Sequence, residues 1–249
     1  MAKRRLRRKG NMRKAQLTRE NILQKAYEIA SREGLEGLSF GVLADRLNMS
    51  KSGVYAHFGS IESLRASVLR CYRERFERDV LQPARLVPDG LRRLQAIFFH
   101  CIHHIATHAE GGLFYISCAA EYDDRRGPVR DELVSCITEL RAALLETLQS
   151  AVRLGQLKPE SDPRQLVFEI YALLLLLQHD KRLLALPDAF LRVRLSFTRL
   201  IQNQARDACF QADADAFPAS ALRQHHARPG YRSRTKWEAC CAPLLASSA

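Results

Sequence analysis

Eight consecutive residues, Lys51 to Phe58 (KSGVYAHF), combine polar donors with regularly spaced apolar side chains. If this segment is helical, Val54 and Phe58 lie four residues apart on one face, and that face anchors the helix to a core. Four side chains that donate hydrogen bonds then remain on the outward faces: Lys51, Ser52, Tyr55 and His57.

The chemistry of this outward set suits nucleic acid. A lysine ammonium binds a phosphate or the O6/N7 edge of guanine, and a serine hydroxyl binds several base edges. A tyrosine hydroxyl and an imidazole are donors at the reach of a phosphate. Gly53 has no side chain, so backbone can approach DNA closely there. The segment is therefore a candidate DNA-reading helix.

The residues before Lys51 complete a helix-turn-helix. A helix is predicted over SFGVLADRL, beginning near Ser39, and the break at Asn48 to Ser50 separates it from the second helix. Ser39 and Ser50 are each placed to cap a helix start with a side-chain oxygen. Asn48 tolerates the left-handed backbone that a sharp reversal needs. The second helix of such a motif enters the major groove; the alternative is an ordinary helical hairpin with a solvated face.

Further features follow in order along this stretch: Gly34 at the end of a first helix, Ser39, the pair Leu43-Ala44, the turn 48–50, the ending Tyr55-x-His57-Phe58 and a helix opening at Ser60. This series resembles the N-terminal domain of the TetR family of bacterial transcriptional repressors. Two positions depart from that pattern. Asn48 stands where glycine is usual, and Ile61 stands where a phosphate-holding lysine is common.

The resemblance implies an all-α fold, with an N-terminal three-helix helix-turn-helix domain and a larger helical C-terminal domain for ligand binding and dimerisation. It also implies that Ser39, Tyr55 and His57 hold phosphates, and that Lys51, Ser52 and Gly53 face bases. With Ser50 at the helix start, the predicted DNA-binding set is Ser39, Ser50, Lys51, Ser52, Gly53, Tyr55 and His57. The remaining implications are double-stranded DNA and a second copy of the chain as partners, and a small-molecule effector that releases a repressor from DNA.

The rest of the chain is patterned for helices. Glycine and proline are scarce between Thr18 and Gln204, and no alternating strand pattern stands out. About nine helices are predicted, over residues 18–32, 39–47, 51–58, 60–80, 89–108, 113–122, 128–154, 164–183 and 187–204. The predicted organisation is a disordered basic arm (1–14), a DNA-binding domain (15–62), an effector and dimerisation domain (63–204) and a disordered tail (205–249).

The net charge of +12 is concentrated near the N-terminus. Residues 1–19 hold nine lysines and arginines and no acid. A run of like charge repels itself and buries nothing, so it is expected to be disordered. It leads directly into the helix-turn-helix, which favours contact with the DNA backbone or minor groove over the alternative of a solubilising tail.

Two long helices near the C-terminal end predict a dimer. The helix over 163–183 is apolar nearly all round through Leu173 to Leu177, so it must be buried on more than one side. One side can face its own domain, and another can face a second subunit together with the helix over 187–204. A two-fold dimer also doubles the DNA site, which predicts a palindromic operator.

Two further clusters could bind small ligands. An aromatic and apolar set could line an effector pocket or could be plain core: Phe98, Ile102, Phe114, Tyr115, Cys118, Leu140, Phe168 and Tyr171. His100, His104 and His108 share one helix face and could bind a metal, completed by Cys101, Glu110 or Glu121; the alternative is a partly solvated face. Because no second cluster has matching spacing, no metal or other cofactor is predicted.

Other classes of function are not favoured. The sequence has no GxSxG, no phosphate-cradling glycine-rich loop and no HExxH, so no enzyme is predicted. No apolar run reaches the roughly 18 residues of a membrane span. The seven cysteines include no CxxC and suggest free thiols in a reducing cytoplasm. A metal-responsive regulator and a non-specific basic DNA-packing protein remain as alternatives.

Overall fold

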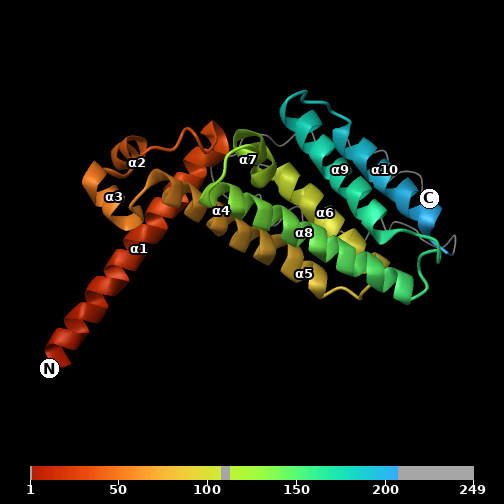
Figure 1. Cartoon of the computed structure of the whole chain (residues 1–249), viewed down its shortest axis with the longest axis horizontal. Coiled ribbons are helices and arrows are strands. Elements are labelled where there is room, and N and C mark those ends of the chain that lie inside the picture. The colour runs from red at the N-terminus through yellow and green to blue at the C-terminus, as the bar shows by residue number, and fades with distance from the viewer. Residues whose placement is uncertain (1, 108–112, 207–249) are drawn as a thin grey trace, which may run out of the picture. The chain divides into compact units, whose positions relative to one another are not determined.

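The computed structural model describes residues 2–107 and 113–206, with side chains from residue 15 onward. In chain order the elements are α1 (Ala2–Glu33), α2 (Phe40–Leu47), α3 (Lys51–Phe58), α4 (Ile61–Phe76), the π-helical turn η1 (Glu77–Leu81), α5 (Gln82–Arg85), α6 (Leu91–Thr107), α7 (Phe114–Tyr122), α8 (Pro128–Arg153), α9 (Pro163–Arg182) and α10 (Ala189–Gln204) (Figure 1). Because α4, η1 and α5 follow one another without a break, they count as one long helix. The described residues then form nine helices and no strand, which confirms the predicted all-α fold.

The chain divides into two compact units. Unit 1 contains residues 2–79 and 113–140, and unit 2 contains residues 80–107 and 141–206. The division differs from the one predicted between residues 62 and 63. The reason is that α4 packs on α1, with Leu64, Val68 and Leu69 fully buried, so α4 completes the core of the helix-turn-helix instead of starting a new domain.

The core of unit 1 is apolar side chains from four helices and a cluster of aromatic rings. Ile22 of α1, Leu43 of α2, Val54 of α3 and Leu64 of α4 have no exposed surface. The rings are contributed by α1, α4 and α7, with neighbouring centroids 5.6 to 6.3 Å apart: Tyr27, Tyr72, Phe76, Phe114 and Tyr115. Such pairs contribute about 0.5–1.5 kcal/mol each beyond area burial, so this cluster holds α7 to the helix-turn-helix unit.

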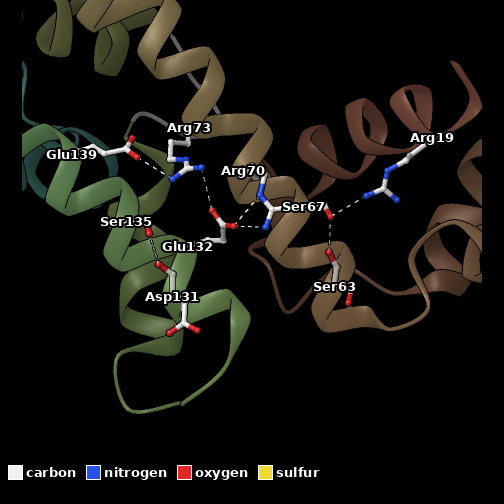
Figure 2. A network of polar contacts seen from close by, with 9 residues as sticks. All are labelled: Arg19, Ser63, Ser67, Arg70, Arg73, Asp131, Glu132, Ser135 and Glu139. Carbon is white, nitrogen blue, oxygen red and sulfur yellow. Dashed lines mark hydrogen bonds and ion pairs between the residues drawn. The ribbon is translucent and has the colours of Figure 1, made fainter. Parts of the chain in front are cut away.

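Ion pairs join α4 to the first half of α8 in the same unit (Figure 2). Arg70 Nε donates to Glu132 Oε1 at 2.9 Å, and Arg73 Nη1 donates to Glu139 Oε1 at 3.0 Å. Arg73 Nη2 also lies 3.9 Å from the second oxygen of Glu132. The arginines and Glu139 remain partly exposed, and surface pairs contribute at most about 1 kcal/mol each, so the main effect of these pairs is on the register of the two helices.

Helix α1 is longer than predicted. It begins at Ala2, whereas the sequence predicted a disordered arm over residues 1–14 and a helix from Thr18. The physical reason is local preference, since arginine, lysine, leucine and methionine are all good helix formers. Figure 1 shows the N-terminal half of α1 projecting beyond α2 and α3.

The end of α4 also differs from the prediction. The helix predicted over residues 60–80 continues past Pro83, which lies in the first turn of α5, and ends at Arg85. Because the α-helical hydrogen-bond ladder restarts after the π-helical turn, Pro83 lies in the first turn of the new ladder, where the N–H that proline lacks has no α-helical partner. The preceding π-helical turn changes the backbone register before Pro83.

The core of unit 2 is formed by α6, α9, α10 and the second half of α8, from which Leu144 and Leu148 are fully buried. Phe98 of α6 stacks on Phe197 of α10, with centroids 3.8 Å apart and ring planes 10° apart. Helices α9 and α10 lie side by side (Figure 1). The end of α10 is tied to the α8–α9 loop, because Lys158 N donates to Gln204 O at 2.9 Å and Arg206 N donates to Gln156 O at 3.0 Å.

Two further observations concern the described residues only. No helix among them is long and apolar enough to cross a membrane. Cys71, Cys101, Cys118 and Cys136 are free thiols, as predicted. The tail predicted to be disordered lies almost entirely outside the described residues.

Candidate nucleic-acid interface

Three capping residues set the ends of α2 and the start of α3. Ser39 Oγ accepts from Val42 N at 3.2 Å, and Ser50 Oγ accepts from Gly53 N at 3.1 Å. Both are therefore helix caps, as predicted, and such caps are worth about 1 kcal/mol each. Asn48 has φ 52° and ψ 45°, which confirms the left-handed backbone expected at the reversal. These caps fix where α3 starts and which way it points.

The inward side of the two helices also matches the prediction. Leu43 and Val54 have no exposed surface, and Ala44 and Phe58 are 5% and 8% exposed. The small Ala44 side chain leaves room for α3 to cross α2. Because Val54 and Phe58 are held in the core, the opposite side of α3 is fixed toward solvent.

The outward side of α3 carries the predicted polar residues. Lys51, Ser52 and Tyr55 are exposed, while Gly53 and His57 are partly buried. Tyr55 is 54% exposed, and its ring packs edge-on against Phe40 of α2, with centroids 5.5 Å apart. This contact limits the ring's freedom without covering it. All seven predicted DNA-binding residues thus lie at the start of α2, in the turn or on α3.

Arg19 is a contributor to this site that the sequence did not reveal. It is one of the basic residues near the N-terminus, yet its side chain contacts the C-terminal end of α3. Its guanidinium donates to the carbonyl of His57 and lies over the ring of Phe58, with Cζ 4.4 Å from the centroid. These partners are nearly forty positions away, so no local pattern indicates the contact.

A second missed cluster holds the loop that leads into α2. Glu36 Oε1 accepts from Tyr122 Oη at 2.8 Å and from Arg125 Nη1 at 2.5 Å, and Glu36 Oε2 accepts from Arg65 Nη2 at 3.0 Å. The hydrogen bond from Tyr122 and the two guanidinium groups hold the pKa of Glu36 below its usual value. Burial, followed by the Glu36 bond, raises the pKa of Tyr122. The loop before Ser39 is thereby fixed to the residues at and just after the end of α7.

The residues predicted to line an effector pocket are divided between the units. Phe114, Tyr115, Cys118 and Leu140 are buried in unit 1, and Phe98, Ile102 and Tyr171 are buried in unit 2. Phe114 and Tyr115 belong to the aromatic cluster, and Phe98 packs on Phe197. Phe168 differs from the prediction. It is 60% exposed, because its position on α9 faces away from the core of its unit.

The histidine cluster falls partly outside the described residues. His104 is buried and His100 is partly buried on α6, and burial lowers the pKa of His100. His108 and Glu110 lie outside the described ranges. Within those ranges, no group of three or more histidine, cysteine or acidic side chains is arranged to hold a metal ion.

Two family profiles match the chain. Residues 22–68 match the profile described as "Bacterial regulatory proteins, tetR family". Residues 90–197 match the profile described as "Tetracyclin repressor-like, C-terminal domain". Together they cover more than half of the chain. The first spans the helix-turn-helix, and the second runs from the start of α6 into α10. No curated protein matches.

Solved structures of the same fold agree with these matches. A TetR transcriptional regulator from Chloroflexus aurantiacus is 21% identical, with a TM-score of 0.69 over 78% of this chain and 98% of that one. KstR2, a ketosteroid transcriptional regulator of Mycobacterium tuberculosis, is 16% identical, with a TM-score of 0.58 over 76% and 96%. AibR, solved with isovaleryl coenzyme A and operator DNA, is 21% identical, with a TM-score of 0.57 over 75% and 97%. The chain belongs to the TetR family of bacterial regulatory proteins and is a DNA-binding transcriptional regulator.

Proposed function

We propose that this protein is a repressor that binds a palindromic operator as a homodimer and is released by a small apolar or amphipathic molecule. The observation that carries the DNA-binding part is the outward face of α3, whose exposed donors stand on a helix fixed by its Ser50 cap and a buried apolar side. A fixed helix with an open polar face fits the major groove.

In this proposal the residues of the site have distinct roles. Ser39, Tyr55 and His57 bind phosphates and set the docking position, whereas Lys51 and Ser52 reach base edges, and Gly53 allows close approach. Residues 2–14 hold eight lysines and arginines, which add sequence-independent phosphate contacts. Each neutralised phosphate steepens the dependence of affinity on salt by about 0.9 in the log–log slope.

An apolar stripe on α9 and α10 supports the homodimer. We use the name for apolar side chains, 38% to 72% exposed, that lie on the two helices or, for Leu183, directly after α9: Phe168, Leu175, Leu176, Leu183, Leu191 and Leu195. A single chain rarely leaves such a set in water, because covering apolar surface is favourable. A second copy presenting the same two helices covers it by two-fold symmetry.

The proposal that a small molecule releases the protein from DNA is supported by two similar structures and by the buried side chains of unit 2. AibR was solved with an acyl coenzyme A together with operator DNA, and KstR2 is described as a ketosteroid regulator. The buried aromatic and apolar side chains of α6 and α9 in unit 2, including Phe98, Ile102 and Tyr171, are of the kind that encloses such molecules. An effector that binds one dimer geometry better shifts the population away from the DNA-binding geometry.

The decisive experiment is selection of bound duplexes from a random DNA pool by the full-length protein at near-physiological salt. A palindromic consensus is expected, and it supports a sequence-specific dimeric regulator. A non-specific DNA-packing protein gives no enrichment. Repeating the selection with a variant that lacks residues 2–14 separates the contribution of the basic residues from that of α3. The same consensus should be selected, but with lower affinity, because the basic residues add binding strength and α3 adds sequence preference.

A further inference from the structure

Arg19 connects three helices within unit 1. From α1, its Nη1 donates to the carbonyl of His57 at 2.5 Å, and its guanidinium lies over the ring of Phe58, with Cζ 4.4 Å from the centroid. Its Nη2 reaches Ser67 Oγ on α4 at 3.4 Å, and Ser67 Oγ in turn donates to the carbonyl of Ser63 at 2.7 Å. Figure 2 shows the reach of Arg19 across to α4.

The contact is placed where it controls the direction of α3. The last four carbonyls of a helix have no intrahelical partner, and the His57 carbonyl is one of them. A guanidinium at this end satisfies the carbonyl and faces the negative pole of the helix dipole. Stacking on Phe58 fixes the same helix end from a second direction.

Only arginine can make this set of contacts. The guanidinium is planar, donates in several fixed directions and stacks on an aromatic face at the same time. A lysine at position 19 keeps the charge but offers one small ammonium, which cannot stack on Phe58 and also bridge His57 to Ser67. The geometry therefore depends on the shape of the side chain as well as on its charge.

We infer that Arg19 is a positioning residue for operator recognition. It holds the C-terminal end of α3 at a fixed angle to α1 and α4, so that the outward side chains meet base edges in register, and its own charge is used inside the protein. This inference rests on the proposed function, namely that α3 reads an operator. Arg19 also lies outside residues 22–68, the segment that matches the N-terminal family profile.

The test compares Arg19→Lys and Arg19→Gln with the control Lys25→Gln, all in the full-length protein. Lys25 is on the same helix, and its ammonium pairs with Glu28 of that helix at 2.9 Å. Dissociation constants are measured for the selected operator and for a scrambled duplex of equal length, over a range of salt concentrations. Both Arg19 variants should lose about tenfold in operator affinity, the cost of one misplaced base contact. Their scrambled-duplex affinities and salt slopes should equal those of Lys25→Gln.

The result for Arg19→Lys decides between positioning and charge. If it binds operator like the wild type while Arg19→Gln weakens both duplexes and lowers the salt slope by about 0.9, Arg19 is a phosphate contact and the inference is wrong. A wild type without preference for the operator contradicts the proposed function itself, which is a different outcome.

Folding is checked by circular dichroism and thermal melting of each variant. If the Arg19 variants do not fold, Ser67→Ala replaces them, because it removes one hydroxyl that anchors the guanidinium. A loss of operator affinity at unchanged scrambled-duplex affinity then supports the inference, and unchanged operator affinity overturns it.

Discussion

In the proposed DNA interface, the side chains of α3 differ in the contacts that their surroundings suit them to make. Tyr55 keeps more than half of its surface exposed although its ring is packed against Phe40, so its hydroxyl is presented at little entropic cost. Lys51 stands at the exposed start of the helix, where a long flexible side chain can reach a groove edge. One residue is therefore suited to positioning and the other to base contact.

We predict that Tyr55→Phe weakens binding to operator and to scrambled DNA by a similar factor, because a phosphate contact carries no sequence information. Lys51→Ala should cost about 1–3 kcal/mol and relax the preference at one base-pair position if lysine reads a base there. Both are measured by titration of labelled duplexes, with Lys25→Ala as the control. Unchanged operator affinity in both variants would mean that α3 docks differently.

Glu36 gives a pH dependence at the same scale. Its pKa in the folded protein lies below the unfolded value of about 4.3, so the carboxylate stabilises the fold above that pH. The contribution is lost as the pH falls through the folded pKa. We predict that Glu36→Gln has a lower free energy of unfolding than the wild type at pH 7, and that the gap closes below about pH 4.

Urea unfolding at pH 7, 5 and 3.5 measures this gap. The control is Glu33→Gln, which neutralises another carboxylate near the end of α1. Because Glu36 is largely exposed, the difference at pH 7 should be about 1 kcal/mol or less. A gap that stays constant down to pH 3.5 would show that the Glu36 interactions do not depend on its charge.

At the scale of elements, the junction before α6 depends on a glycine. Gly90 has φ 88°, a backbone conformation that residues other than glycine rarely adopt. A Cβ at this position would also run into Gln156 Oε1, which accepts from Leu91 N at 2.8 Å and so caps the start of α6. Strain and crowding therefore act together at one residue.

We predict that Gly90→Ala lowers the free energy of unfolding by about 1–3 kcal/mol, whether the alanine is strained or Gln156 is displaced from its cap. The matched control is Gly155→Ala in the same unit. Gly155 has φ 67°, but its added Cβ would meet only Arg206 Nη1 at an ordinary 3.6 Å. Chemical denaturation of both variants isolates the crowding term, and an equal loss in the two would leave strain as the whole effect.

The elements themselves could mostly be predicted, since their ends carry local signals. Ser39 and Ser50 cap helices where expected, Asp162 caps the start of α9, and Gly155 follows the end of α8 with a positive φ. The predicted helix ends are wrong where the neighbouring backbone, and not the local sequence signal, decides whether a helix continues. The sequence predicted a helix that ends near residue 80, but the π-helical turn before Pro83 lets the helix continue to Arg85.

The candidate site could be predicted only in its local part. The seven residues of the DNA-binding set follow from spacing on two short helices and from the family pattern. The residues that hold this site in place, Arg19 and Glu36, could not be predicted, because their hydrogen-bond partners lie 38 and 86 positions away in the sequence. Contacts of that range depend on how helices pack, and a single sequence carries no periodic trace of them.

For the whole molecule, the central prediction concerns subunit association through the apolar stripe. Leu176→Glu should convert the protein from dimer to monomer, because a carboxylate in an apolar interface must be desolvated. Leu176 is 52% exposed in the single chain. Sedimentation velocity measures the mass, and the same variant should lose operator binding at concentrations where the wild type is saturated.

The control is Leu86→Glu, which adds the same charge at a leucine that is 89% exposed on the loop after α5. It should keep the wild-type mass. Equal masses for all three proteins, whether monomer or dimer, would show that the stripe is not the interface.

The stripe also has a consequence for gene dosage. When only paired chains occupy an operator and the chains are mostly unpaired, the concentration of the active form rises with the square of the amount synthesised. A twofold change in expression then changes the active form by about fourfold. Because the apolar stripe on α9 and α10 makes pairing necessary, it would set how steeply operator occupancy responds to the amount of this regulator in the cell.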